Sequence, residues 1–511
     1  MFMPKKKKQK KKNFILSLKL QTEAYQDDLL HKRFETGRKI YNACLGEALK
    51  RYHHLRRSRR YKTLMKELTA LNKKNSPTKE HEEKKNQVID DLNALRQAHR
   101  LTEYDLHAYV GPMNQHFGSS MDINTAQKIA TRVWEAMEDL IFSSGKSVRF
   151  KKFGQVTSLE GKSNKQGIRF RNNQLHWLGL VIPVAIRKKD IYAQEALQGK
   201  IKFCRIVKKA VKGKDRFYLQ LVIGGLPPTK RTKDGSRKQI YGNSRVGIDP
   251  SLQSIAYTSE STVKLQELAP SVESLEKVIL RIQRRMDRSR RATNPHKYNA
   301  DGTVKKANRE PWVKSNHYKA SHRQLISLNR KLAAIREQEH NQLANHLLTV
   351  GTDIFVEETD FKALAKRAKE TKVSPKTGKY QRKKRFGKSI SLKAPSKFFS
   401  ILSRKLGYIG KEIHYVNPWT FKASQHNHIT DSYDKKTLSN RWNQIGGHKI
   451  QRDLYSAFLI MNSNNDLQTT DRQRCINTFN HFITLHDQEI SRIEDNKAVK
   501  LFASFGIKRT A

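Results

Sequence analysis

The sequence predicts a multidomain protein with α+β and α/β parts: a β-barrel-like N-terminal domain that carries a helical insertion, then a second domain of strands and helices. Three observations predict this. A chain of 511 residues is too long for one ordinary core. Strand-like and helix-like periodicities alternate in long blocks. A polar run containing Pro and Gly separates two of these blocks and indicates a domain boundary.

The first predicted domain begins with a strand and then turns helical. Apolar residues alternate along residues 14–20, which is the period of a half-buried strand. The next stretch has helical periodicity, and its clearest helix begins after Asn124, a favourable N-cap residue. Strand-like alternation then returns as far as Ile223, with a turn at Gly213. We therefore expect a helical insertion to separate the first strand from the rest of its sheet.

The second predicted domain begins near Arg245. Its first strands are followed by two long helices, and the first of these carries four arginines within about two turns: Arg281, Arg284, Arg285 and Arg288. Such a face is either solvated or in contact with a nucleic-acid backbone, and the sequence leaves both open. Residues 366–397 are rich in Lys and Arg and contain Pro and Gly, which predicts a flexible loop or lid rather than core.

Charge dominates the composition. The chain has 102 Lys and Arg against 47 Asp and Glu, a formal net charge of +55. An excess this large predicts a polyanionic partner, and nucleic acid is favoured over a membrane surface because no run of about 18 apolar residues is present. Seven of the lysines lie in residues 1–13, which form either a solvated arm or a nuclear import signal. No secretory signal is visible.

Cysteine usage is sparse. Cys44, Cys204 and Cys475 occur singly, which excludes a disulfide framework and a zinc knuckle built from CxxC pairs. This pattern fits a reducing compartment. Tyr104 and Tyr109, in the helical insertion, and Trp134 offer rings on which nucleic-acid bases could stack, but core packing is the favoured interpretation for each of them.

Three carboxylates stand out in this basic chain. Asp249, Glu357 and Asp453 lie in the apolar contexts RVGIDPSLQSIAYTS, TDIFVEETDFKAL and HKIQRDLYSAFLIMN. Each carboxylate alone is explained by a helix cap or a surface charge. Together, two at strand ends and one at a helix start, they predict a site for two Mg²⁺ ions about 3.5–4 Å apart, which can hydrolyse a phosphodiester. Ser456 and Ala457, one turn further on, are small enough to let that helix lie close to the sheet.

Six stretches carry a resemblance to a known family: VGIDPSLQSIAYTS, IQRRMDRSRR, LISLNRKLAAIREQEHNQLANHLL, DIFVEETDF, LGYIGKEIHYVNPWTFKASQ and QRDLYSA. In this order they resemble the RuvC-type nuclease core of the transposon-encoded TnpB proteins and of the related compact type V CRISPR effectors. The resemblance covers about residues 245–463. It extends more weakly upstream, where SVRFKKFG and the interrupted barrel resemble the family's wedge and recognition domains.

The resemblance implies an order of domains. These are a basic tail (1–13), a wedge β-barrel (14–24 and 146–230), a helical recognition insertion (25–145), a linker (231–244), an RNase H-like RuvC nuclease domain (245–418 and 451–463), a target-nucleic-acid-binding insertion (419–450) and a C-terminal extension outside the core (464–511). Most relatives carry four cysteines in the insertion, where this chain has none. His426, His428 and His448 remain there and make a weak zinc site, so no zinc is expected.

The chain also departs from the family beside the last carboxylate. Tyr455 stands where the family has asparagine, and Gln451 stands where it has an acidic residue. The catalytic and metal-binding residues that the resemblance implies are Asp249, Glu357 and Asp453, with Glu358 as an alternative register for the second.

The implied activity is that of an RNA-guided DNA endonuclease, a Mg²⁺-dependent hydrolase. A guide RNA would pair with one strand of a double-stranded DNA target, and the protein would read a short flanking motif. We expect a monomer with its RNA, without a membrane partner, in a prokaryotic cytoplasm at the nucleoid. Whether the context is a transposon or a CRISPR system stays open. The alternatives are an RNA-guided DNA-binding repressor that does not cleave, an unguided transposase or resolvase, and a ribosomal-type RNA-binding protein.

Overall fold

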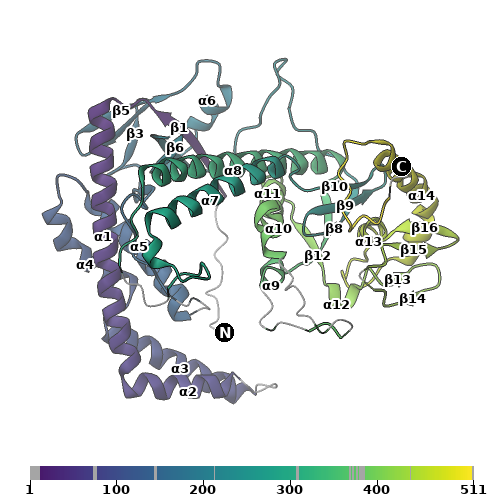
Figure 1. The fold of residues 1–511 in the computed structure, drawn as a ribbon, viewed down its shortest axis with the longest axis horizontal. Helices are drawn as coiled ribbons and strands as arrows, with labels where there is room; N and C mark the ends of the chain where they lie inside the picture. The colour runs from purple at the N-terminus through teal and green to yellow at the C-terminus, as the bar shows by residue number, and fades with distance from the viewer. Residues whose placement is uncertain are drawn as a thin grey trace. The chain divides into compact units, whose positions relative to one another are not determined.

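The chain divides into two compact units, Met1–Thr229 and Lys230–Ala511 (Figure 1). The structure is a computed structural model, and it describes residues 12–72, 78–142, 145, 147–211, 213–305, 310–366, 370, 373–375, 378, 386–437 and 439–508. Most of the basic tail, residues 1–11, lies outside the described residues.

The described strands of the first unit form one curled, antiparallel seven-stranded sheet in the order β2-β6-β7-β1-β5-β4-β3. They are β1 (Asn13–Leu20), β2 (Ser158–Glu160), β3 (Arg169–Arg171), β4 (Gln174–Trp177), β5 (Leu180–Ala185), β6 (Ile201–Val211) and β7 (Lys214–Gly224). The expected alternation in β1 is confirmed, because every second side chain from Phe14 to Leu20 is buried. The expected turn at Gly213 is also confirmed, with φ of 78°. Closure of this sheet into a barrel stays a prediction.

Long helices separate β1 from its partner strands in the sequence. These are α1 (Ala24–Arg57), α2 (Arg59–Leu71), α3 (Lys79–Ala98), α4 (Glu103–His116) and α5 (Ile123–Phe142). A short helix that the alternating pattern did not predict, α6 (Ile191–Leu197), begins where the Asp190 carboxylate accepts from the Ala193 amide at 3.0 Å.

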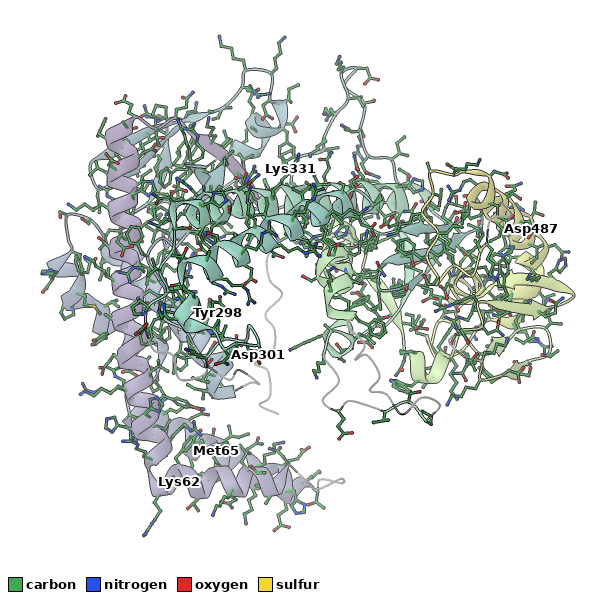
Figure 2. The ribbon with its side chains drawn as sticks, in the orientation of Figure 1. Lys62, Met65, Tyr298, Asp301, Lys331 and Asp487 are labelled. Carbon is green, nitrogen blue, oxygen red and sulfur yellow. The ribbon has the colours of Figure 1, made fainter. Side chains whose placement is uncertain are left out.

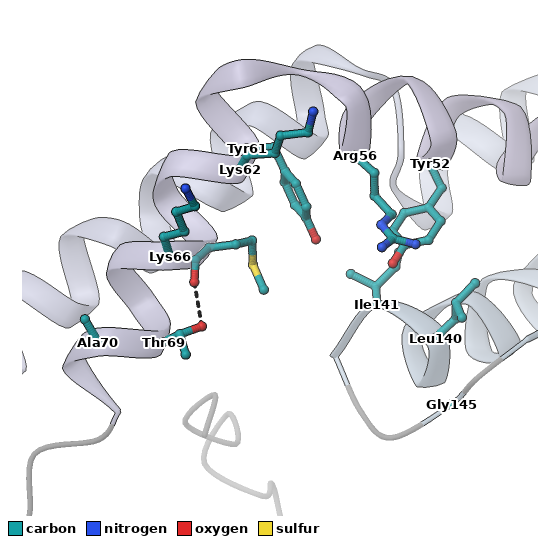
Figure 3. A pocket seen from close by; sticks show the side chains of 11 residues that line it. Tyr52, Arg56, Tyr61, Lys62, Lys66, Thr69, Ala70, Leu140, Ile141 and Gly145 are labelled. Carbon is teal, nitrogen blue, oxygen red and sulfur yellow. Dashed lines mark hydrogen bonds between the residues drawn. The ribbon is translucent and has the colours of Figure 1, made fainter.

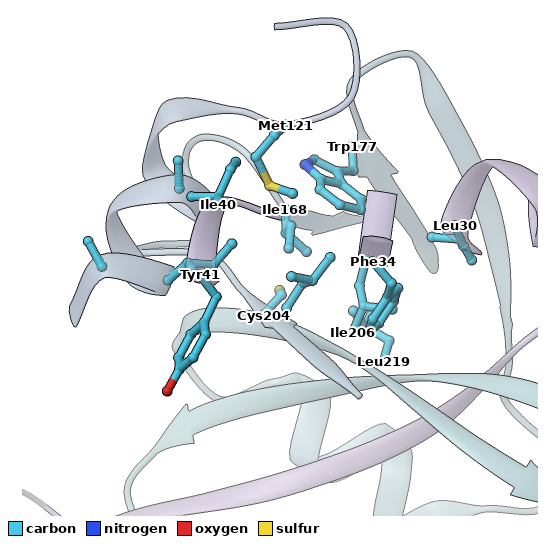
Figure 4. Packing of buried hydrophobic residues seen from close by; sticks show 14 of the residues in the cluster. Leu30, Phe34, Ile40, Tyr41, Met121, Ile168, Trp177, Cys204, Ile206 and Leu219 are labelled. Carbon is cyan, nitrogen blue, oxygen red and sulfur yellow. The ribbon is translucent and has the colours of Figure 1, made fainter. Parts of the chain in front are cut away.

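The N-terminus of α5 differs from the prediction. Asn124 lies inside the helix, and Asp122 precedes it and accepts from the Thr125 amide at 3.1 Å. The Asp122 carboxylate also accepts from the Trp177 indole at 2.8 Å. Asp122 therefore links the insertion to the sheet, and the apolar cluster of Figure 4, which includes Trp177 and Met121, packs beside it. The sequence pattern around Asn124 contains no sign of this long-range partner.

The second unit is built on a five-stranded sheet of described strands in the order β10-β9-β8-β11-β12. The strands are β8 (Arg245–Pro250), β9 (Ser254–Ser259), β10 (Val263–Glu267), β11 (Asp353–Glu357) and β12 (Ile413–Val416). β9 runs antiparallel to both β10 and β8, and β11 runs parallel to both β8 and β12. Two further hairpins pair β13 (His426–Asn427) with β14 (Ser432–Tyr433) and β15 (Trp442–Ile445) with β16 (His448–Gln451).

Helices cover both faces of this sheet. They are α7 (Val272–Thr293), α8 (Asn316–Val350), α9 (Phe361–Leu364), α10 (Phe386–Lys393), α11 (Pro395–Tyr408), α12 (Pro418–Phe421), α13 (Arg452–Met461) and α14 (Arg472–Asp495), with a 3-10 turn at Pro295–Lys297. Apolar residues of α8 and α11 share a core with Ile354 and Val356, while those of α13 and α14 share a core with Phe355. Alternation along β11 thus separates the two cores.

Two expectations for the second unit are wrong. Within residues 366–397, expected to form a loop or lid, residues 386–393 form α10, and Lys393 is fully buried. Burial of this ammonium is possible because it contacts Glu267, lies 3.6 Å from Glu273 and donates to the Ala269 carbonyl. The rest of the expected lid falls largely on residues outside the described ones, from 367 to 385.

Residues 464–508 were expected to lie outside the core, and they instead pack into it. Phe479 and Phe482 of α14, together with Phe505 further on, join the same apolar cluster as α13. The three cysteines are buried and unpaired. In the part of the chain that the structure describes, no helix is long and apolar enough to cross a lipid bilayer.

Candidate active site

Two of the predicted carboxylates lie at the ends of adjacent parallel strands. Ile248 of β8 is paired with Val356 of β11, so Asp249 and Glu357 follow at equivalent positions. Because neighbouring residues of a strand point to opposite faces, both carboxylates lie on the α13 face of the sheet, opposite Ile248 and Val356. The sheet therefore brings together two side chains that are more than a hundred positions apart in the sequence.

The third carboxylate comes from the helix that packs on this face. Asp453 is in the first turn of α13, where the Gln451 side chain caps the helix by accepting from the Leu454 amide at 2.8 Å. Gly247 permits the close approach, since a Cβ there would lie 2.1 Å from the Ala457 carbonyl oxygen. At the other end of the helix, Arg245 donates to the Met461 carbonyl at 2.9 Å. β8 thus holds α13 from its middle to its C-terminal end.

Asp249, Glu357 and Asp453 line one pocket of about 400 Å³, which we call the carboxylate pocket. Its other lining residues are Pro250, Ser251, Ser424, Gln425, Lys435, Lys436, Arg441, Arg452 and Ser456. The exposed Glu358 is not among them. Glu357 is therefore the glutamate that the structure places beside the two aspartates.

The three carboxylates destabilise one another's charged forms. Burial raises the pKa of Asp249 well above its usual range, and the charges of Glu357 and Asp453 raise it further. Burial raises the pKa of Glu357, and the charge of Asp453 adds to this. Burial also raises the pKa of Asp453, although Arg452 and Arg441 oppose the rise. The pocket thus holds negative charge that its protein surroundings only partly offset.

Positive side chains also line the same pocket. The Arg452 guanidinium lies 3.4 Å from the Asp453 carboxylate, and that of Arg441 lies 3.9 Å from it. Lys436 donates to the Asn443 amide oxygen at 2.9 Å, and Lys435 lines the pocket beside it. Acidic and basic groups in one pocket are an arrangement suited to a cation together with an anionic substrate.

The donor chemistry of the pocket fits a hard divalent cation. Carboxylate oxygens are the ligands that Mg²⁺ prefers, and the Ser456 hydroxyl, also in the lining, is buried without a hydrogen-bond partner. Among the described residues, however, no group of three or more His, Cys, Asp or Glu side chains is close enough together to hold a metal ion. The carboxylates share a pocket without converging on one point.

The segment from 419 to 450, which contains no cysteine, has its own internal contacts. The Tyr455 hydroxyl lies 2.7 Å from Nδ1 of His428 and accepts from the His428 amide at 3.2 Å. Arg472 donates to the His428 carbonyl at 2.8 Å. His426 lies 3.1 Å from the Asp431 carboxylate and stacks on Tyr433. Tyr455 therefore ties α13 to the β13–β14 hairpin.

No family model matches this chain, and no curated protein matches it either. Among solved structures, the cryo-EM structure of a Cas12f1–sgRNA–target DNA complex is similar, with a TM-score of 0.40 and 11% sequence identity over 87% of this chain and 84% of that chain. The cryo-EM structure of a CRISPR–Cas12f ternary complex is similar with a TM-score of 0.25 and 11% identity over 87% and 83% of the two chains. The functional conclusion therefore rests on the carboxylate pocket itself.

A second pocket, of about 910 Å³, lies in the first unit among α1, α2 and the end of α5 (Figure 3). It combines the rings of Tyr52 and Tyr61 with the basic side chains of Arg56, Lys62 and Lys66. Aromatic and basic side chains in one pocket suit a nucleic-acid strand, because bases stack on rings while phosphates attract cations. These residues were not predicted from the sequence.

The three aromatic residues named from the sequence, Tyr104, Tyr109 and Trp134, differ in how far they are buried. Tyr109 and Trp134 pack against the core of the first unit, as expected. Tyr104 does not, since 82% of its surface is exposed.

Proposed function

We propose that this chain is an RNA-guided DNA endonuclease that hydrolyses phosphodiesters at one Mg²⁺-dependent site. The observation that carries the proposal is the carboxylate pocket, in which segments far apart in the sequence bring Asp249, Glu357 and Asp453 together with basic side chains. The net charge of +55 and the resemblance of residues 245–463 to the TnpB family support RNA and DNA as the partners.

Each group in the pocket has a task in this proposal. Asp249, Glu357 and Asp453 would hold Mg²⁺ through their carboxylate oxygens. When bound, two Mg²⁺ ions supply an activated water and neutralise charge on the leaving oxygen. Lys435 and Lys436 would attract the phosphodiester backbone and orient it over the carboxylates. The raised pKa values of the carboxylates support a cation here, because it would offset charge that the protein leaves unbalanced.

One observation favours a second candidate, an RNA-guided DNA-binding repressor without cleavage. Asp453 is in contact with Arg452 and Arg441, and the carboxylates do not converge in the described structure. In a nuclease, these guanidiniums would turn to the substrate phosphate once a cation replaces them. In a repressor they would stay on Asp453. Both candidates bind a guide RNA, and they differ only in whether the target DNA is cleaved.

The test begins with the bound RNA. The full chain is purified from a host that also carries the DNA flanking its gene, and the copurified RNA is sequenced. We expect one RNA of defined sequence. Double-stranded DNA that contains the matching target beside a randomised flank should then be cut in Mg²⁺ and left intact in EDTA. Protein that is free of nucleic acid and still cuts DNA would contradict guidance by RNA.

Site variants separate the nuclease from the repressor. Asp249→Ala and Glu357→Ala should abolish cleavage while RNA binding stays within a few-fold of the wild type. Glu358→Ala is the matched control, because it removes the same chemical group one position along, outside the pocket, and it should cut normally. If the wild type binds RNA and target DNA but leaves both strands whole, the repressor is correct.

A further inference from the structure

The corner where β16 turns into α13 is held by residues far along the chain. Gln451 ends β16 and is also the N-cap of α13, two positions before Asp453. Its side chain is engaged by the helix, since Oε1 accepts from the Leu454 amide at 2.8 Å. A contact that holds the backbone of Gln451 in place therefore also holds the first turn of α13, in which Asp453 lies.

His486 of α14 makes that contact. The Gln451 amide donates to Nε2 of His486 at 3.0 Å, and both residues are buried. Nδ1 of His486 lies 2.8 Å from the carboxylate of Asp487, the residue marked on α14 in Figure 2. Because a backbone amide can only donate, Nε2 must be the acceptor and Nδ1 must carry the proton. Asp487 stabilises this tautomer, and burial lowers the pKa of His486 although the Asp487 carboxylate opposes the fall.

A second contact to the same corner comes from residues 505–506. The Gln451 side-chain amide donates to the Phe505 carbonyl at 3.4 Å. Trp442, which is paired with Gln451 across the β15–β16 hairpin, donates from its indole to the Gly506 carbonyl at 2.8 Å. A Cβ at Gly506 would lie 2.3 Å from Cβ of Arg441, one of the basic residues of the carboxylate pocket. Residues beyond 464 thus contact both Gln451, two positions before Asp453, and Arg441, which lines the pocket.

We propose that His486 is a positioning residue for the metal-binding carboxylate of Asp453, acting through the Gln451 amide. The inference deepens the proposed function and rests on it. The contacts form a chain of hydrogen bonds from the exposed Asp487 through the buried His486 to the buried Gln451 at this corner. Loss of the acceptor would leave the Gln451 amide buried and unpaired, and relief of that cost would shift the cap and with it Asp453.

The test compares three variants of the full chain with the wild type. His486→Leu removes the acceptor and puts an apolar side chain of similar size in its place. His486→Gln retains an acceptor oxygen that can reach the Gln451 amide. His481→Leu is the matched control, because it makes the same change at an exposed position of the same helix.

Hydrogen exchange of the peptide around residues 450–455 is measured first, in the metal-free chain. His486→Leu should speed exchange there about tenfold, the effect of losing one ordinary hydrogen bond, and neither other variant should do so. The Mn²⁺ dissociation constant by calorimetry, and Mg²⁺-dependent cleavage, should each worsen by about 10–100-fold in His486→Leu, as for other residues that orient metal ligands. His486→Gln should restore most of both.

The outcomes keep the inference separate from the proposed function. If the wild type neither binds Mn²⁺ nor cuts DNA, the proposed function fails, whatever the exchange data show. If the wild type does both and His486→Leu matches it in Mn²⁺ affinity and cleavage, the positioning role is overturned. A loss in His486→Leu that His486→Gln does not restore, with faster exchange throughout α14, would also overturn it, because the effect would then be general unfolding.

Discussion

The second unit buries acidic side chains in two places that differ in what faces them. Glu489 of α14 accepts from Lys264 at 2.7 Å, from Arg492 at 2.6 and 2.7 Å, and from the Leu265 amide at 3.0 Å. In the carboxylate pocket, Asp249 instead faces Glu357 and Asp453, which raise its pKa. A fold that pairs one buried acid so fully has the means to pair the others. We therefore infer that the function of the carboxylate pocket, and not the stability of the fold, accounts for its unbalanced negative charge.

The largest effect on the free energy of unfolding is expected at Glu489, whose charge is balanced by Lys264 and Arg492. Glu489→Ala should lower the free energy of unfolding by about 3 kcal/mol, the low end for a broken buried ion pair, because Lys264 and Arg492 each keep about a third of their side-chain surface in water. Guanidinium unfolding of the full chain measures this. Asp495→Ala, which removes an exposed acid from the same helix, should change stability by less than about 0.5 kcal/mol. Equal effects of the two variants would remove the distinction between the two places.

Binding of Mg²⁺ in the carboxylate pocket should have a smaller effect on stability. In chain stripped of nucleic acid, Mg²⁺ at ten times its dissociation constant should stabilise the fold by about 1.4 kcal/mol. Asp249→Asn should abolish this gain, because it removes a carboxylate that the ion needs. Glu489→Gln serves as the control and should keep the gain. Stabilisation that persists in Asp249→Asn would place the ion elsewhere.

Without metal, neutralising one pocket carboxylate should stabilise the protein. Asp249→Asn keeps the shape of the side chain and removes the charge that Glu357 and Asp453 repel, so we expect a gain of about 0.5–2 kcal/mol at pH 7. Glu489→Gln, the same change at the balanced acid, should instead destabilise. Thermal unfolding in EDTA measures both. A loss of stability in Asp249→Asn would mean that the pocket is not repulsive.

The gain should shrink as the pH falls. The pKa of Asp249 is raised in the folded state, so the folded chain binds this proton more tightly than the unfolded chain does, and stability falls as pH rises from the ordinary aspartate range through the raised pKa. At low pH the wild-type carboxyl is already neutral and the advantage of Asp249→Asn disappears. Unfolding measured in EDTA from pH 8 to pH 4 tests the sign. A gain that grows toward acid would contradict it.

The sequence located the three carboxylates because local patterns determine where each one lies. Alternation along β8 and β11 assigns Asp249 and Glu357 to one face, and the apolar run after Asp453 predicts its helix. Strand alternation also favours Glu357 over Glu358, and the structure places only Glu357 in the carboxylate pocket.

Contacts between distant segments could not be predicted in this way. The hydrogen bond from Gln451 to His486 spans 35 positions, and nothing near either residue indicates the other. Asp122 was missed as the cap of α5 for a related reason, since its selection over Asn124 depends on a partner, Trp177, in a distant strand. Lys393 was assigned to a loop because a lysine-rich stretch is usually solvated, and the acids that permit its burial lie more than a hundred positions away.

The position of β1 in its sheet has a consequence for biosynthesis. β1 pairs with β7 from Asn13↔Gly224 to Lys19↔Tyr218, so its main partner is translated about two hundred residues after it. Helices α1–α5 rest on contacts that are closer in sequence and are expected to form on the ribosome while β1 still has free edges. A half-apolar strand in that state is prone to pair with other nascent chains. The lysines that directly precede β1 in the sequence would then act as gatekeeper residues. Their charge would keep β1 from pairing with other chains until β7 has been translated.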